Sequence, residues 1–106
     1  MIDEIDIDEF AARRTAGQFV LDVREPHEYE EAHVPGAILV PLGDVEHRVG
    51  EVPTGAPILI ICRSGARSLQ AAKFLAEQGR DVTNVAGGTL AWIGAGFDVA
   101  TGMERG

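Results

Sequence analysis

The single cysteine of the chain, Cys62, lies in a short segment whose residue types could activate a thiol. Five residues follow it, two of them arginines: Arg63, Ser64, Gly65, Ala66 and Arg67. Positive charge and the backbone amides of a tight, glycine-containing turn favour thiolate over thiol, and thiolate is the nucleophilic form. The same turn would bind a small anionic substrate. These neighbours argue against the ordinary alternative, an inert buried cysteine.

The strand and helix that would position this segment are visible in the hydrophobic pattern. Residues 57–62 form a short, continuous apolar run, which is typical of a buried strand in a parallel sheet. Residues 68–78 carry leucine and alanine at helical spacing and end before Gly79. Ligands of open parallel sheets bind beyond the carboxyl ends of strands, so the segment from Cys62 to Arg67 is predicted to lie at such a site.

The remaining chain reads as further strands alternating with helices. Strands are predicted at residues 19–23, 37–40 and 82–86, and helices at 8–16 (with Asp8 as N-cap), 42–49 and 89–95. This alternation predicts an α/β fold of three layers, with a central, mostly parallel sheet flanked by helices. Residues 101–106 lack apolar periodicity, and fraying is expected there.

Composition excludes several classes of function. The chain has 106 residues, an expected single domain, with 17 acidic and 9 basic side chains and a net charge of -8, which argues against nucleic-acid binding. One cysteine cannot form an internal disulfide, which favours a reducing compartment, the cytoplasm. The acidic first ten residues do not resemble an export signal, and no apolar run approaches the ~20 residues of a membrane span. The three histidines show no metal-ligand spacing, and no cofactor is expected.

Four segments resemble the signatures of rhodanese-like, single-domain sulfurtransferases. Residues 62–68, CRSGARS, resemble the active-site loop of that family; the other three are LDVRE at 21–25 with EYE at 28–30, AHVPGAI at 32–38, and VAGGTLAW at 85–92 with GF at 96–97. The four segments occur in the family's order and cover nearly the whole chain. The resemblance implies a rhodanese-like domain over residues 1–106.

The resemblance also implies a mechanism and a set of partners. Cys62 would attack the outer sulfur of a small anionic donor such as thiosulfate, sulfite would leave, and a cysteine persulfide would pass its sulfur to a thiol, cyanide or protein acceptor. Amides of the loop would stabilise the sulfur, and Arg63 and Arg67 would attract the sulfonate group of the donor. The oligomeric state stays open.

Asp22 and Arg24, at the end of the predicted strand 19–23, are candidates for supporting the site. Charges at the end of a buried strand must be paired, so both residues are expected to hold a loop in place. One candidate role for Asp22 is hydrogen bonding to amides of the active-site loop or to Arg67.

Two other functions remain open from the same residues. One is a cysteine-dependent phosphatase or an arsenate reductase; the other is a non-catalytic rhodanese-like binding module, against which the intact Cys62 and its two arginines count. Four residues separate Cys62 from Arg67, one fewer than in the phosphatases that share this fold, and the smaller loop favours sulfur transfer. Ser64 stands where the two-domain, thiosulfate-using rhodaneses carry a basic residue, so the preference for thiosulfate stays open. The acidic runs at 3–9 and 25–31 fit either a solvated face or a docking surface for a basic acceptor.

Overall fold

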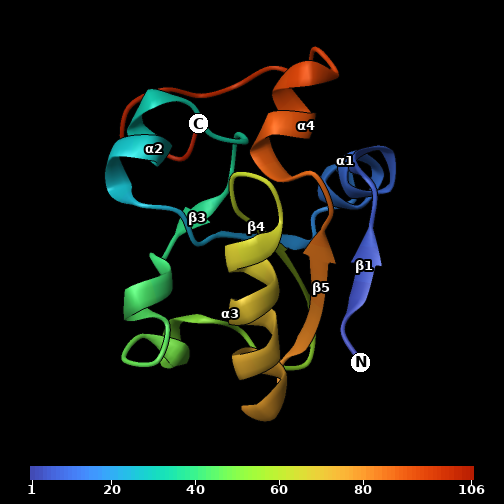
Figure 1. Ribbon diagram of the computed structural model, residues 1–106, viewed down its shortest axis with the longest axis vertical. Helices are drawn as coiled ribbons and strands as arrows, with labels where there is room; N and C mark the ends of the chain where they lie inside the picture. Colours follow the sequence, from blue (N-terminus) through green and yellow to red (C-terminus); the bar gives the residue numbers. More distant parts are fainter.

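Five parallel strands form one sheet in the computed structural model, which describes all 106 residues (Figure 1). The strands are β1 (Asp3–Ile5), β2 (Phe19–Asp22), β3 (Ile38–Leu39), β4 (Pro57–Ile61) and β5 (Asp81–Val85). Their order across the sheet is β1-β5-β4-β2-β3, and every neighbouring pair is parallel. The central strand β4 therefore pairs with β2 and β5, and Cys62 follows its carboxyl end directly.

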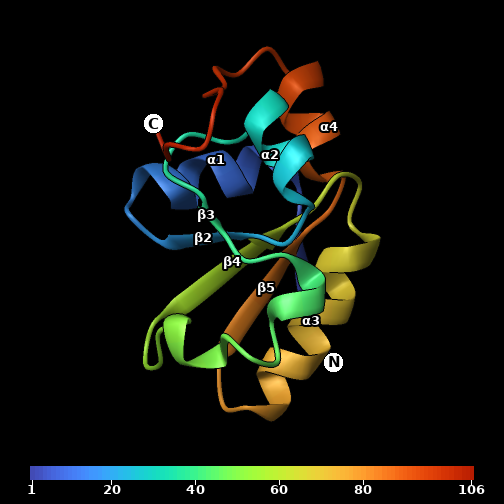
Figure 2. The ribbon, with the colours of Figure 1, turned by 90° about the vertical axis from the view of Figure 1, so that its left-hand side faces the viewer.

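Four helices cover the two faces of the sheet. They are α1 (Ile7–Thr15), α2 (Pro26–Glu31), α3 (Ala66–Glu77) and α4 (Gly88–Gly94). Figure 2 shows α3 on one side of the strands and α1, α2 and α4 on the other. The predicted three-layer α/β arrangement is confirmed. None of these helices is long and apolar enough to cross a membrane.

The side chains of β4 fill a separate core on each face of the sheet. Ile58 and Ile60 pack toward α3, in a cluster that also contains Leu75 and Cys62. Leu59 and Ile61 point the other way, in a cluster that contains Phe10 of α1, Tyr29 of α2 and Trp92 of α4. This alternation explains the continuous apolar run, because a central strand buried on both faces has no polar side.

Two local predictions are wrong. The N-cap of α1 is Asp6, whose Oδ1 accepts from the amide of Glu9 at 2.9 Å, and not Asp8, which lies within the first turn. Residues 42–49 do not form one helix; the segment has two 3₁₀ turns, Leu42–Asp44 and Val49–Glu51. The pattern of that stretch suits a short turn as well as a helix, and Gly43 weakens the helix.

Two elements have no counterpart in the prediction. Strand β1 is a three-residue edge strand with two acidic side chains, and helix α2 has six residues and starts with Pro26. Neither is long enough to show a hydrophobic period. The tail at 101–106, where fraying is expected, is largely exposed, but its backbone makes hydrogen bonds to the segment before β3: Gly102 donates to the carbonyl of Glu30 and Gly36 donates to the carbonyl of Arg105, both at 2.7 Å.

Candidate active site

The active-site loop, residues 62–68, runs from the end of β4 into the first turn of α3. Gly65 is the residue before the helix, and its φ of 116° lies in the left-handed region that side chains with a Cβ rarely adopt. This turn directs the first amides of the helix back toward Cys62. The glycine is therefore required by the backbone, as the sequence suggests.

Cys62 is 1% exposed, and its sulfur accepts hydrogen bonds from the loop. The amide of Gly65 lies 3.1 Å from Sγ, and the hydroxyl of Ser68 lies 3.3 Å from it. Burial raises the pKa of the Cys62 thiol, but the hydrogen bonds of Ser68, Gly65 and Ser64 outweigh burial, so the pKa is lowered overall. The thiolate is thus stabilised mainly by hydrogen-bond donors, as expected of the amides of the turn, and neither arginine donates to the sulfur.

Ser68 is a further residue of the site, beyond those predicted from the sequence. It is fully buried in the first turn of α3, beneath the sulfur of Cys62. A polar residue at a buried position of an amphipathic helix, one turn after the loop glycine, was the available signal. Ser68 closes the segment 62–68 and opens the predicted helix 68–78, and the sequence alone gives its hydroxyl no separate role.

Arg67 forms a bidentate ion pair with Glu28 of α2. Its two Nη atoms lie 2.7 and 2.9 Å from the carboxylate oxygens. The hydrogen bond from Arg67 is the largest cause that lowers the pKa of Glu28 to about 2. The pair links the start of α3 to α2, and it neutralises one of the two cations that the sequence assigned to the substrate.

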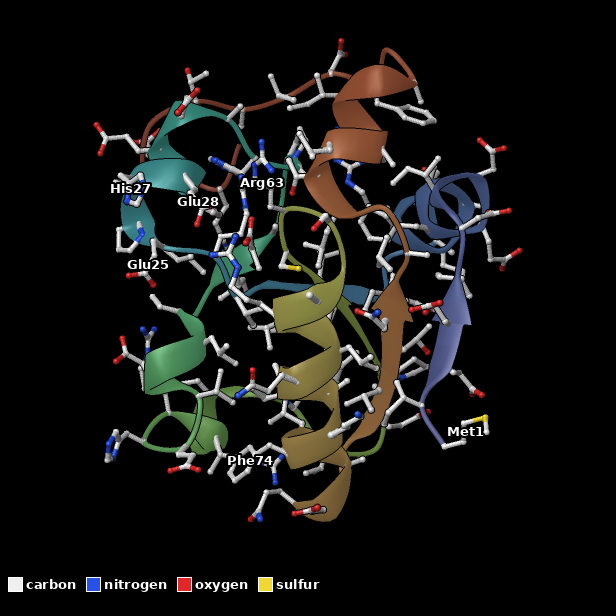
Figure 3. All side chains as sticks on the ribbon, in the orientation of Figure 1. Met1, Glu25, His27, Glu28, Arg63 and Phe74 are labelled. Atoms are coloured by element: carbon white, nitrogen blue, oxygen red, sulfur yellow. The ribbon has the colours of Figure 1, made fainter.

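Arg63 is the cation of the loop that remains unpaired. It is exposed, and none of the ion pairs or hydrogen bonds of the chain involves its side chain. It borders a hollow of about 180 Å³ between α2 and α4, which is also lined by Arg24, Glu28, Glu31, Ala32, Thr89, Leu90 and Ile93. Figure 3 shows Arg63 and Glu28 together on this side of the loop. The neighbouring loop residues Ser64 and Ala66 are also exposed.

Asp22 and Arg24 form a buried ion pair with each other. Arg24 Nη2 lies 2.8 Å from Asp22 Oδ2, and it also donates to the carbonyl of Ala32 after α2, at 2.8 Å. Asp22 accepts no bond from the active-site loop or from Arg67, so the role considered for it is wrong. The reason is strand alternation. Arg67 belongs to α3, and the side chain of Asp22 lies on the other face of the sheet.

The start of α4 is fixed to the backbone of the loop. The amide and hydroxyl of Thr89 donate to the carbonyl of Cys62 at 2.8 and 3.0 Å, and the amide of Leu90 donates to the carbonyl of Arg63 at 3.1 Å. Gly88 packs against the same two carbonyls. Two of the four resemblance segments, at 62–68 and 85–92, therefore meet at the sulfur-bearing turn.

The imidazole of His33 is buried away from the loop. Its Nδ1 lies 2.8 Å from the carbonyl of Tyr29 and its Nε2 lies 3.1 Å from the carbonyl of Arg105.

No group of three or more histidine, cysteine, aspartate or glutamate side chains is arranged to hold a metal ion. The donors at Cys62 and the unpaired Arg63 beside it could support the chemistry of a sulfur nucleophile.

The Glu28–Arg67 pair makes the stability of the protein sensitive to acid. Because the pKa of Glu28 is lowered on folding, its contribution is complete above the ordinary carboxyl range near 4.5 and is lost as the pH falls toward 2. Between about pH 5 and about pH 2.5, we expect the wild type to lose about 1–2 kcal/mol more than Glu28→Gln, after allowance for solvent screening of the half-buried Arg67. Urea unfolding at the two pH values measures this difference; parallel losses in both proteins would contradict it.

Known proteins are similar to this chain over most of its length. The family model for the rhodanese-like domain matches residues 6–95. A putative sulfur carrier protein of Bacillus subtilis, YrkF, is 43% identical over 96 residues; the match covers 88% of this chain and 52% of that protein, so the chain spans about half its length. A sulfurtransferase of Allochromatium vinosum is 36% identical over 102 residues, 93% of this chain and 95% of that one.

A solved structure shows the same arrangement of the backbone. The crystal structure of a rhodanese-related protein from Thermoplasma volcanium superposes with a TM-score of 0.88 at 28% identity, and covers 96% of this chain and 99% of that chain. The sequence match and the shared fold both extend through the loop at Cys62. The chain belongs to the rhodanese-like domain family.

Proposed function

We propose that this protein is a sulfurtransferase, which moves sulfane sulfur from a donor such as thiosulfate to a thiol, cyanide or protein acceptor through a persulfide on Cys62. The observation that carries the proposal is the sulfur of Cys62 at the end of β4, with the amide of Gly65 and the hydroxyl of Ser68 directed at it. Relatives named as a putative sulfur carrier and a sulfurtransferase support rhodanese-type sulfur transfer at the level of the family.

The reaction has two half-reactions, and each is a displacement at sulfur. The Cys62 thiolate attacks the outer sulfur of thiosulfate; the new Sγ–S bond forms as the S–S bond of the donor breaks, and sulfite leaves with the bonding pair. An acceptor thiolate then attacks the outer sulfur of the persulfide, the Sγ–S bond breaks, and the Cys62 thiolate is restored. No further oxidant or reductant is needed.

The loop residues have distinct parts in this proposal. The amide of Gly65 and the hydroxyl of Ser68 donate to the sulfur, and they would stabilise negative charge on the thiolate and on the persulfide. Arg63 is free to bind the sulfonate group of the donor, because no carboxylate neutralises it. Arg67 contributes mainly through its ion pair with Glu28, which holds the first turn of α3 against α2.

Intact-protein mass spectrometry tests the proposal directly. After incubation with thiosulfate, the protein is expected to gain the mass of one sulfur atom, and the adduct is expected to disappear when cyanide or a small thiol is added. Absence of an adduct with thiosulfate and with other sulfane-sulfur donors would contradict sulfur transfer. Steady release of phosphate from an aryl phosphate, without sulfur loading, would favour the phosphatase or arsenate reductase alternative instead.

Substitution of the two arginines separates substrate binding from structure. We expect Arg63→Ala to raise the KM for thiosulfate about five- to tenfold with little change in the melting temperature, because it removes an unpaired, exposed cation. Arg67→Ala should lower the melting temperature more and raise KM less, because it leaves Glu28 without its partner. Steady-state kinetics and thermal unfolding of both variants decide; a larger KM effect for Arg67→Ala would assign the sulfonate contact to Arg67.

A further inference from the structure

Asn84 lies fully buried on β5, under the turn that carries Cys62. Its side-chain Nδ2 donates to the carbonyl of Gly65 at 3.2 Å and to the carboxylate of Glu4 on β1 at 2.8 Å. Asn84 pairs with Glu4 in the register of the sheet, and its side chain lies on the α3 side. A side chain on the neighbouring strand, 19 residues from Gly65, thus reaches the backbone of the active-site loop.

The carbonyl of Gly65 is an acceptor on which three donors converge. The amide of Leu69, the hydroxyl of Ser68 and the Nδ2 of Asn84 each lie 3.2 Å from it. The hydroxyl of Ser68 also lies 3.3 Å from the sulfur of Cys62. A hydroxyl has one proton, so Ser68 can donate to the carbonyl or to the sulfur, but not to both at full strength.

The orientation of the Asn84 amide is fixed by its two acceptors. Each hydrogen of Nδ2 has an oxygen to bind, one of Glu4 and one of Gly65. The reverse orientation would place Oδ1 against both oxygens. In the observed orientation Oδ1 is buried and has no partner, so the two bonds of Nδ2 are kept at the cost of one unsatisfied acceptor.

We infer that Asn84 is a positioning residue of the active site: its Nδ2 satisfies the carbonyl of Gly65 and leaves the proton of the Ser68 hydroxyl for the sulfur of Cys62. When Cys62 is a thiol, Ser68 can donate to the carbonyl and accept from the S–H group. When Cys62 is a thiolate, Ser68 turns to the sulfur, and Asn84 remains as a donor to the carbonyl. The inference rests on the nucleophilic role of Cys62 in the proposed function.

Titration of Cys62 in Asn84→Leu tests the inference. Leucine has the same number of side-chain heavy atoms and the same branching at Cγ, but it is somewhat larger; it removes both the Nδ2 donor and the unpartnered Oδ1. Ultraviolet absorbance of the thiolate, taken as the difference from Cys62→Ser, gives the thiolate fraction against pH. We expect the titration midpoint to move upward, with about a three- to tenfold lower thiolate fraction at a pH below both midpoints. An unchanged midpoint would overturn the inference.

A double-mutant cycle with Ser68→Ala shows whether Asn84 acts through Ser68. If it does, Asn84→Leu has no further effect on the midpoint in the Ser68→Ala background, because the proton that it positions is gone. Independent, additive shifts would overturn the inference. Asn84→Ala removes the same donor with a smaller side chain, and the same upward shift is expected should the leucine not be accommodated.

The controls keep other causes apart. Glu4→Gln retains an acceptor for Nδ2. The thiolate fraction of Cys62 in this variant is expected to stay within about twofold of that in the wild type at the same pH. The charged groups around the turn, Arg63, Arg67, Glu28 and Glu4, are unchanged in Asn84→Leu, so a shift cannot come from them. The titration needs no sulfur donor: a wild type that fails to load sulfur would contradict the proposed function, whereas an unmoved midpoint would contradict only the role of Asn84.

Discussion

Replacement of Cys62 by serine is expected to lower kcat/KM for sulfur transfer from thiosulfate to cyanide by at least about a thousandfold. The hydroxyl of serine does not ionise in the range where the loop lowers the pKa of the Cys62 thiol, and an alkoxide is a poor match for attack on sulfur. Serine nevertheless fits the same space and can use the same donors, the amide of Gly65 and the hydroxyl of Ser68. The fold should therefore remain, with a change in stability below about 1 kcal/mol.

Three measurements decide this prediction. Formation of thiocyanate gives the rate, thermal unfolding shows whether the variant is folded, and Cys62→Ala provides a control that has no hydroxyl at all. Both variants should lose turnover to the same background. Retained turnover in either folded variant would show that Cys62 is not the nucleophile.

The pH dependence of the wild type adds a second expectation for the same residue. Because the thiolate is the reactive form and the pKa of Cys62 is lowered, the rate of sulfur loading should rise with pH and level off below the ordinary range of a cysteine thiol. Mass-spectrometric loading rates across this range check the sign. A rate that continues to rise through the ordinary thiol range would mean that the donors of the loop do not stabilise the thiolate.

The position of this cysteine was predictable because it depends on neighbours in sequence. The apolar run of β4 and the leucine and alanine spacing of α3 fix a strand and a helix, and a strand, a glycine turn and a helix N-terminus in succession bring amides to the sulfur by local geometry alone. The layer architecture follows from the same alternation of elements.

The partners of the loop were not predictable, because they come from elsewhere in the chain. Glu28 is 39 residues from Arg67 and lies on a six-residue helix whose charges show no apolar period. Asn84 reaches Gly65 only because β5 lies beside β4, and strand order cannot be derived from the pattern of one strand. The bond expected from Asp22 to the loop or to Arg67 fails for a related reason. Whether two such side chains meet depends on the face of the sheet to which each one points.

Gly88→Ala is expected to destabilise the protein by about 3–5 kcal/mol. Gly88 has a φ of 57°, and an added Cβ would lie 2.5 Å from the carbonyl oxygen of Cys62 and 2.6 Å from that of Arg63. These atoms belong to the backbone of the active-site loop and cannot turn aside as a flexible side chain can. Relief of the overlap would separate α4 from the loop and weaken the hydrogen bonds from Thr89 and Leu90 to the same carbonyls.

Gly79→Ala is the matched control, because it isolates the cost of backbone conformation. Gly79 has a φ of 81° with no atom within 4 Å of an added Cβ, so its replacement should cost only about 1–2 kcal/mol. Urea unfolding of both variants is expected to show at least about 2 kcal/mol more loss for Gly88→Ala. Equal losses in the free energy of unfolding would mean that the backbone of the loop moves away from the added Cβ at no measurable cost. In that case the carbonyls of Cys62 and Arg63 are not held rigidly, and the amides directed at the sulfur owe their position to the first turn of α3 alone.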